Sequence, residues 1–186
     1  MIQSQRRDLL KGALGALAFT VGGQALMLTP REARAQGASF RVLKTEEAET
    51  IEVLGEALVL DARKAGIAHF IDHHLSVPPE ECLLEARIMN VRPPYSNLYR
   101  AAVGAVERAC QARHGGRRLI ELNAEEARAF VEDMRQNKIE GWQGPPGGFV
   151  YFILRSDAVD VVYGTMEGYA KLGIPYMPHI APQKSW

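Results

Sequence analysis

The apolar residues along most of the chain follow the 3.6-residue period of an α-helix. Ala127, Phe130, Val131 and Met134 stand at positions i, i+3, i+4 and i+7, which places them on one helix face. Asn123, which stands three residues before Glu126, is typical of a capping box at the start of that helix. The same spacing predicts helices over residues 46–60, 65–75, 96–113 and 149–170, and a short helix over 80–89.

Glycine and proline divide these helices from one another. Gly115 and Gly116 are expected to end the helix over residues 96–113, and the long stretch 149–170 is expected to bend near Ser156 or Gly164. Thr45 offers a hydroxyl group that can cap the helix over 46–60. No ladder of alternating strands is found, so the sequence predicts an all-α, single-domain, compact helical bundle over residues 36–186.

The last residues, 174–186, do not fit a helix. Pro175, Pro178 and Pro182 interrupt the segment, which therefore predicts an irregular, extended tail. Its large apolar side chains need cover from water, supplied either by the chain's own core or by a partner protein. With Tyr169 from the preceding helix, the residues assigned to such a partner interface are Ile174, Tyr176, Met177, Ile180 and Trp186.

The chain begins with a pattern typical of an export signal. Arg6 and Arg7 precede Asp8, two leucines and a lysine, as in a twin-arginine motif. A weakly apolar stretch, 12–28, follows and leads to Ala33-Arg34-Ala35, which carries small residues where a signal peptidase reads them. We predict that residues 1–35, called the leader below, are cleaved after Ala35. The alternatives are an uncleaved anchor or an ordinary secretory signal.

The net charge of the chain without its leader excludes some classes of function. Without the leader's five basic and two acidic residues, 17 basic and 20 acidic residues remain, a net charge near −3. This leaves no basic surface for nucleic acid or anionic lipid.

Cys82 and Cys110 would stand in an oxidising compartment after export, so they could form one internal disulfide. They could instead pair with another subunit or stay buried and reduced.

One cluster of residues suggests metal chemistry. His69 and His73 are four residues apart in His-Phe-Ile-Asp-His-His, a spacing compatible with two zinc ligands on one helix face. The glutamate of the His-Glu-x-x-His motif is missing, and a site would need a distant third ligand. The alternative function is therefore a small periplasmic metal-binding protein or enzyme that uses His69 and His73.

Other catalytic motifs are absent from the sequence. It has no Glu-x-x-His pair for a di-iron site, no Cys-x-x-Cys-His haem motif, no dinucleotide fingerprint and no Gly-x-Ser-x-Gly elbow. No catalytic, metal or cofactor-binding residue is therefore assigned. A chain without a cofactor has no need of folded export for itself, so we expect that the signal serves a partner that carries one. A self-contained helical binding domain is a third interpretation.

Three segments, together with the leader, carry a resemblance to a known family. They are FIDHHLS at residues 70–76, YSNLYRAAVGAVE at 95–107 and the long segment from FVYFILRSDAVD to YAKLGIP at 149–175. With them the chain resembles subunit 3, the small or gamma subunit, of gluconate 2-dehydrogenase and related flavin-dependent sugar and sugar-acid dehydrogenases. Many members of the family continue after Tyr169 with a Gly-Asn and Gly-Trp loop and a Phe-Pro-Gly, whereas this chain enters its proline-rich tail.

The resemblance implies a non-catalytic role in a complex. A large subunit would hold FAD and oxidise the sugar or sugar acid, and a multihaem cytochrome c subunit would pass electrons toward quinone. The small subunit would bind the large one, help it to mature and carry it through the twin-arginine translocase. The complex is then expected in the periplasm, at the inner membrane.

Overall fold

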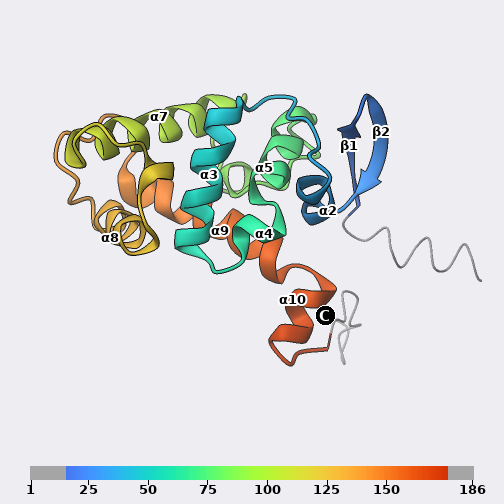
Figure 1. The fold of residues 1–186 in the computed structure, drawn as a ribbon. Coiled ribbons are helices and arrows are strands. Elements are labelled where there is room, and N and C mark those ends of the chain that lie inside the picture. Colours follow the sequence, from blue (N-terminus) through green and yellow to red (C-terminus); the bar gives the residue numbers. More distant parts are fainter. Residues whose placement is uncertain (1–15, 176–186) are drawn as a thin grey trace, which may run out of the picture.

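Helix α3, Thr45–Leu58, lies at the centre of the fold. Its side chains Ile51 and Leu54 are completely buried, and α4, α5, α7, α8 and α9 pack around it. Residues 16–175 are described in a computed structural model of the chain, and its helices form one body with a small hairpin at one end (Figure 1). The other helices are α2 Pro30–Ala35, α4 Ala62–Ala65, α5 Ile67–Ser76, α6 Glu85–Ile88, α7 Ser96–Arg113, α8 Ala124–Arg135, α9 Gly147–Tyr163 and α10 Met166–Lys171, with a 3-10 turn at Leu119–Glu121.

The predicted all-α fold is confirmed, and the boundaries of α7 and α8 agree with the sequence pattern. Both hydrogen bonds of the capping box before α8 are formed. The Asn123 side chain accepts a hydrogen bond from the Glu126 amide at 2.9 Å, and the Glu126 carboxylate accepts one from the Asn123 amide at 2.9 Å. These bonds satisfy two of the amides that every helix start leaves unpaired.

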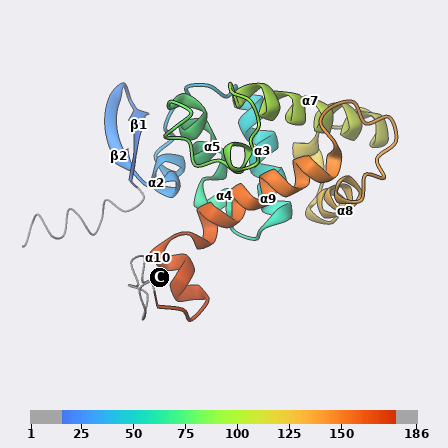
Figure 2. The ribbon, with the colours of Figure 1, turned by 180° about the vertical axis from the view of Figure 1, so that it is seen from behind.

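The long C-terminal helix is interrupted at Gly164, one of the two predicted positions. Thr165 then caps α10, because its hydroxyl accepts a hydrogen bond from the Gly168 amide at 3.0 Å. Helix α9 runs through the body along α3, in front of it in the view from behind, whereas α10 projects beyond the body (Figure 2). The break at Gly164 therefore places α10 where its outer side chains face away from the core.

Three predicted boundaries are wrong. Residues 65–75 are not one helix, since Gly66 has a φ of +87° and separates α4 from α5. Only Glu85–Ile88 of the segment 80–89 is helical, because the preceding residues form turns after Pro78 and Pro79. Thr45 is the first residue of α3 rather than its cap, and the Glu47 carboxylate accepts from the Lys44 amide instead.

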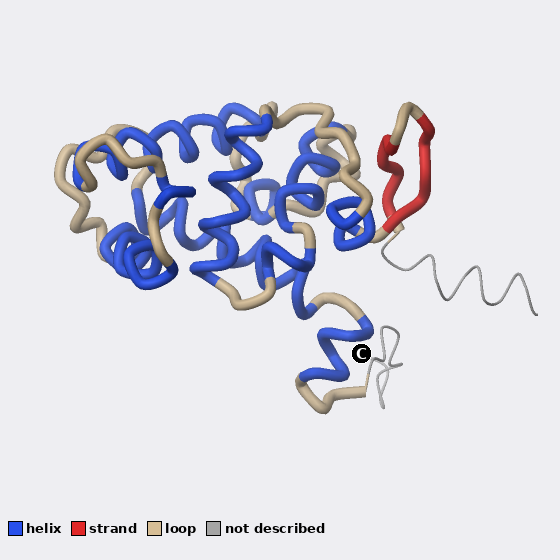
Figure 3. The backbone as a smooth tube through the Cα atoms, viewed as in Figure 1, coloured by secondary structure: helices blue, strands red, loops and turns tan. Residues whose placement is uncertain are grey.

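The only sheet among residues 16–175 lies in the predicted leader. Strands β1, Leu17–Val21, and β2, Gln24–Leu28, pair antiparallel through the turn at Gly22 and Gly23 (Figure 3). Both turn glycines have positive φ, 56° and 83°, the conformation that a two-residue hairpin loop requires. Residues 17–28 of the leader's apolar stretch therefore form a hairpin.

The carboxylate of Asp72 joins the helical body to the segment that follows the leader. It accepts hydrogen bonds from the backbone amides of Arg41, Val42 and Leu43 at 2.8–2.9 Å. Asp72 is buried in α5, so three consecutive amides are fixed to an internal acceptor. This contact sets the path of the chain between α2 and α3.

Candidate functional site

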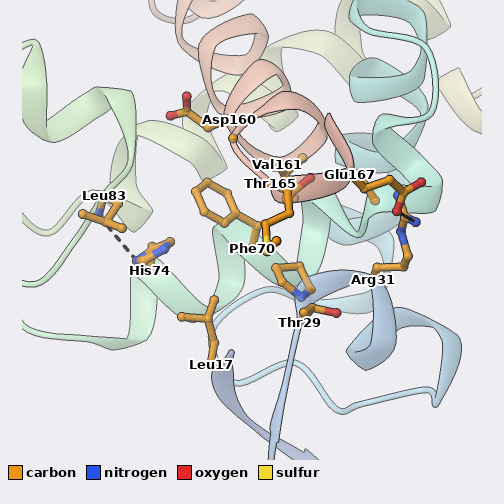
Figure 4. Close-up of a pocket in the computed structure, with 14 residues that line it drawn as sticks. Leu17, Thr29, Arg31, Phe70, His74, Leu83, Asp160, Val161, Thr165 and Glu167 are labelled. Carbon is orange, nitrogen blue, oxygen red and sulfur yellow. Dashed lines mark hydrogen bonds and ion pairs between the residues drawn. The ribbon is translucent and has the colours of Figure 1, made fainter. Parts of the chain in front are cut away.

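A cavity of about 560 Å³ opens between the leader, α5 and the junction of α9 with α10 (Figure 4). Its size is within the range of small-molecule sites. Most of its wall is apolar. Side chains from five parts of the chain contribute to that wall: Leu17, Phe70, Leu83, Val161 and Met166.

His74 provides the buried polar group of the cavity. Its Nδ1 accepts a hydrogen bond from the Leu83 amide at 3.4 Å, so the ring proton is assigned to Nε2. That nitrogen is buried and has no hydrogen-bond partner among the described residues. Burial, together with the neighbouring His73, lowers the pKa of His74 to about 4. The imidazole therefore stays neutral at ordinary pH and presents a single N–H donor.

Charged residues also line the cavity. Burial raises the pKa of the Asp160 carboxyl, and Arg31 of the leader forms an ion pair with Glu167 of α10. The hydroxyl of Thr165, also in the lining, is already engaged as the cap of α10. This arrangement can bind an apolar group, whereas the Nε2 of His74 is itself buried. Among the described residues, this cavity does not bring a nucleophilic side chain together with a general base.

His69 and His73, the candidate metal ligands, lie under the leader hairpin. The ring of Phe19 is 6.1 Å from the ring of His69 and 5.7 Å from that of His73, centroid to centroid. The Nε2 of His69 is 3.1 Å from the carbonyl oxygen of Ala38. Burial lowers the pKa of both histidines. Residues 16–175 contain no group of three His, Cys, Asp or Glu placed to hold a metal.

Comparison with protein-family models gives a match to gluconate 2-dehydrogenase subunit 3 over residues 45–180. The match begins at α3 and extends through α10. This chain belongs to that family. Comparisons with curated proteins and with solved structures gave no match. As a member of the subunit 3 family, the chain is related to one subunit of a dehydrogenase complex.

Two of the subunit's predicted interface residues fall within its described part. Tyr169 is partly buried in α10, and Ile174 is 51% exposed. Tyr176, Met177, Ile180 and Trp186 lie outside the described residues, as do Arg6 and Arg7 of the export motif. Sequence reasoning missed Met166 and Leu172, which are 58% and 54% exposed on and just after α10. The sequence signal that could have revealed Met166 and Leu172 is a helical pattern with apolar residues on more than one face of the helix.

The subunit 3 chain does not contain the predicted disulfide, since both cysteines are free and fully buried. Cys82 lies near Tyr99 and Asp157, which interact with it electrostatically. Cys110 is eleven residues beyond Tyr99 on α7, about 16 Å along the helix axis. Bridged cysteines need Cα atoms within about 7 Å of each other. Burial raises the pKa of both thiols, that of Cys110 to about 11.

Asp157 is the most deeply buried acidic group among residues 16–175, and the sequence pattern did not single it out. Its carboxyl accepts hydrogen bonds from the Glu85 amide at 2.9 Å and from the hydroxyl of Tyr99. Burial raises the pKa of Asp157 to about 7. The residue connects α9 to α6 and α7, which makes it a structural link rather than part of the cavity.

Proposed function

We propose that this chain is the non-catalytic small subunit of a periplasmic, flavin-dependent sugar or sugar-acid dehydrogenase. It binds the large subunit, which holds FAD and performs the oxidation, and a cytochrome c subunit with several haems accepts the electrons. The chain assists maturation of the large subunit and carries it through the twin-arginine translocase by means of Arg6 and Arg7. Membership of the gluconate 2-dehydrogenase subunit 3 family supports this proposal.

The observation that carries the binding part of the proposal is the apolar surface on and after α10. Met166, Leu172 and Ile174 are each more than half exposed, and α10 projects from the helical body (Figure 1). Water-exposed apolar side chains gathered on one projecting element are typical of a protein interface. One ion pair holds α10 to the body, Lys171 with Asp61 at 3.0 Å, and a second joins Glu167 to Arg31 of the leader. The surface is thus presented on an anchored element.

Co-purification tests the interface. The chain is expressed with its large subunit, and Leu172→Ser and Ile174→Ser are compared with Ile88→Ser, which replaces a 64% exposed side chain on α6. Burial of one such fully exposed side chain is worth roughly 1.5–3 kcal/mol, and about half of each side chain is exposed here, so each α10-side variant should weaken binding roughly four- to tenfold. The Ile88 variant should bind like the wild type. Equal capture of all three variants would contradict the proposed interface.

Export is tested separately. The large subunit, produced without a leader of its own, is followed into the periplasm with the wild-type chain and with Arg6→Lys/Arg7→Lys. We expect the large subunit to remain in the cytoplasm with the double variant. Its arrival in the periplasm in equal amount would refute the carrier role and leave the binding result unaffected.

A further inference from the structure

Residues 17–35 are folded onto the helical body, although the sequence marks them as part of a removable leader. Strand β1 contacts α5, and α2 contacts both α4 and α5. The hairpin and α2 lie at the end of the body opposite α8 (Figures 1 and 2). The family match begins later, at residue 45, so this docked segment is additional to the shared domain.

Helix α2 fits closely against the body. Ala33 is completely buried, and the guanidinium of Arg34 is 2.8 Å from the carboxylate of Glu52 on α3. The Pro30 carbonyl is so close to Gly66 that a Cβ added to residue 66 would lie 2.2 Å from its oxygen. A glycine is therefore required at this contact for steric reasons as well as for its positive φ.

The hairpin adds a second area of contact. Phe19 is 3% exposed, and its ring lies against His69 and His73. The Ser39 amide donates a hydrogen bond to the Thr20 carbonyl at 2.9 Å, so the chain beyond the predicted cleavage site pairs with the strand before it. The leader segment is thereby connected to the body on both sides of Ala35.

The predicted cleavage site itself is inside this packed unit. The bond after Ala35 ends at the amide nitrogen of Gln36, and that N–H donates to the Glu32 carbonyl at 2.9 Å. Ala33, the other small residue of the site, is buried and helical. A peptidase that binds an extended segment needs these backbone groups free and both small side chains accessible. Neither condition holds while α2 is docked.

We propose that the helical body binds residues 17–35 as an internal ligand and so masks its own leader cleavage site. Signal peptidase then hydrolyses the Ala35–Gln36 bond only after the segment is displaced. Water adds across this amide, leaving a carboxylate on Ala35 and an amine on Gln36. This inference rests on the leader in the proposed function, but it does not depend on the large subunit.

The test uses the purified full-length chain and a detergent-solubilised bacterial signal peptidase, with the products identified by mass spectrometry. A synthetic peptide of residues 22–42 measures cleavage of the undocked site. Because cleavage of a masked site follows the population of the open form, the folded chain should be cut at least about tenfold more slowly than the peptide. Equal rates, or a peptide that is not cut after Ala35, would overturn the proposal.

Two glycine variants provide a matched comparison. Gly66→Ala should push α2 away and raise the cleavage rate toward that of the peptide. Gly116→Ala is the control, because Gly116 has a similar φ of +89° but no atom within 4 Å of an added Cβ. It imposes the same backbone strain without touching the leader, so its cleavage rate should equal that of the wild type. Equal rates for the two variants would contradict the masking contact.

A side-chain variant covers the case in which Gly66→Ala does not fold. Glu52→Gln weakens the attachment of Arg34 and should raise the cleavage rate several-fold, with circular dichroism confirming an unchanged helix content. Glu132→Gln, which loses a pair with Arg135 on α8, is its control and should have no effect. These assays contain no large subunit, so a failed capture experiment and a failed masking experiment remain distinguishable.

Discussion

Replacing Asp157 with asparagine should remove a specific part of the pH dependence of the protein's stability. Asp157 is completely buried, and its burial raises the carboxyl pKa to about 7. An unfolded aspartate has a pKa near 3.9. Between about pH 4 and 7 the folded chain therefore holds a proton that the unfolded chain has lost. By linkage, this group's contribution to stability is complete below about pH 4 and is lost as the pH rises through 7.

The size of the effect follows from that interval. Each pH unit in which the two states differ by one proton changes the free energy of unfolding by 1.36 kcal/mol. From pH 5 to pH 8 the wild type should therefore lose about 3 kcal/mol relative to Asp157→Asn. The amide can still accept from the Glu85 amide and meet the Tyr99 hydroxyl, the two partners of Asp157, so the variants should be similar at pH 5.

Urea unfolding at several pH values measures this difference. His69, His73 and His74 change stability in the opposite direction, because burial lowers their pKa values and the unfolded chain binds the extra protons. Their effect is common to both proteins and cancels in the comparison. Asp133→Asn, which replaces an aspartate paired with Arg113 near the surface, is the control. The reasoning is refuted if Asp157→Asn follows the same pH profile as the wild type.

Three further predictions follow from contacts in the body. Asp72→Ala leaves three backbone amides without their acceptor, and should lower the free energy of unfolding by about 3 kcal/mol; a loss below about 1 kcal/mol in urea titration would argue against the contact. His74, whose pKa is lowered to about 4, should show no imidazole titration by NMR between pH 5 and 8, and a midpoint in that range would contradict its buried state. Cys82 and Cys110, both buried free thiols, should react with a thiol reagent slowly in buffer and fully in urea. Fewer than two reactive thiols per unfolded chain would show that the two cysteines form a disulfide.

Local signals were sufficient to place α7 and α8. Helix α8 could be placed because Asn123 and Glu126 are close in sequence and their reciprocal hydrogen bonds depend on little else. The break at Gly164 was likewise visible as a glycine in an apolar helical pattern. The family could be proposed because its motifs extend over the same helices, and the match over residues 45–180 confirms it.

Contacts between distant residues could not be read from the sequence. The hairpin carries a turn signal in Gly22 and Gly23, but its other support comes from Phe19 against α5, some fifty residues away in the chain. The buried state of Asp157 depends on Tyr99, 58 residues earlier. The sequence left open whether Cys82 and Cys110 form a bridge or stay buried and reduced for the same reason, because the spacing of two cysteines does not reveal their positions in the fold.

The carboxylate of Asp72 also has a mechanical consequence. A force applied at residue 16 and directed away from the body would load the β1–β2 hairpin first and then α2. It would next reach the three hydrogen bonds between Asp72 and residues 41–43, which share the load because they join consecutive amides to one carboxylate. The leader segment can therefore detach from the body while the three hydrogen bonds to Asp72 keep the applied force from reaching α3.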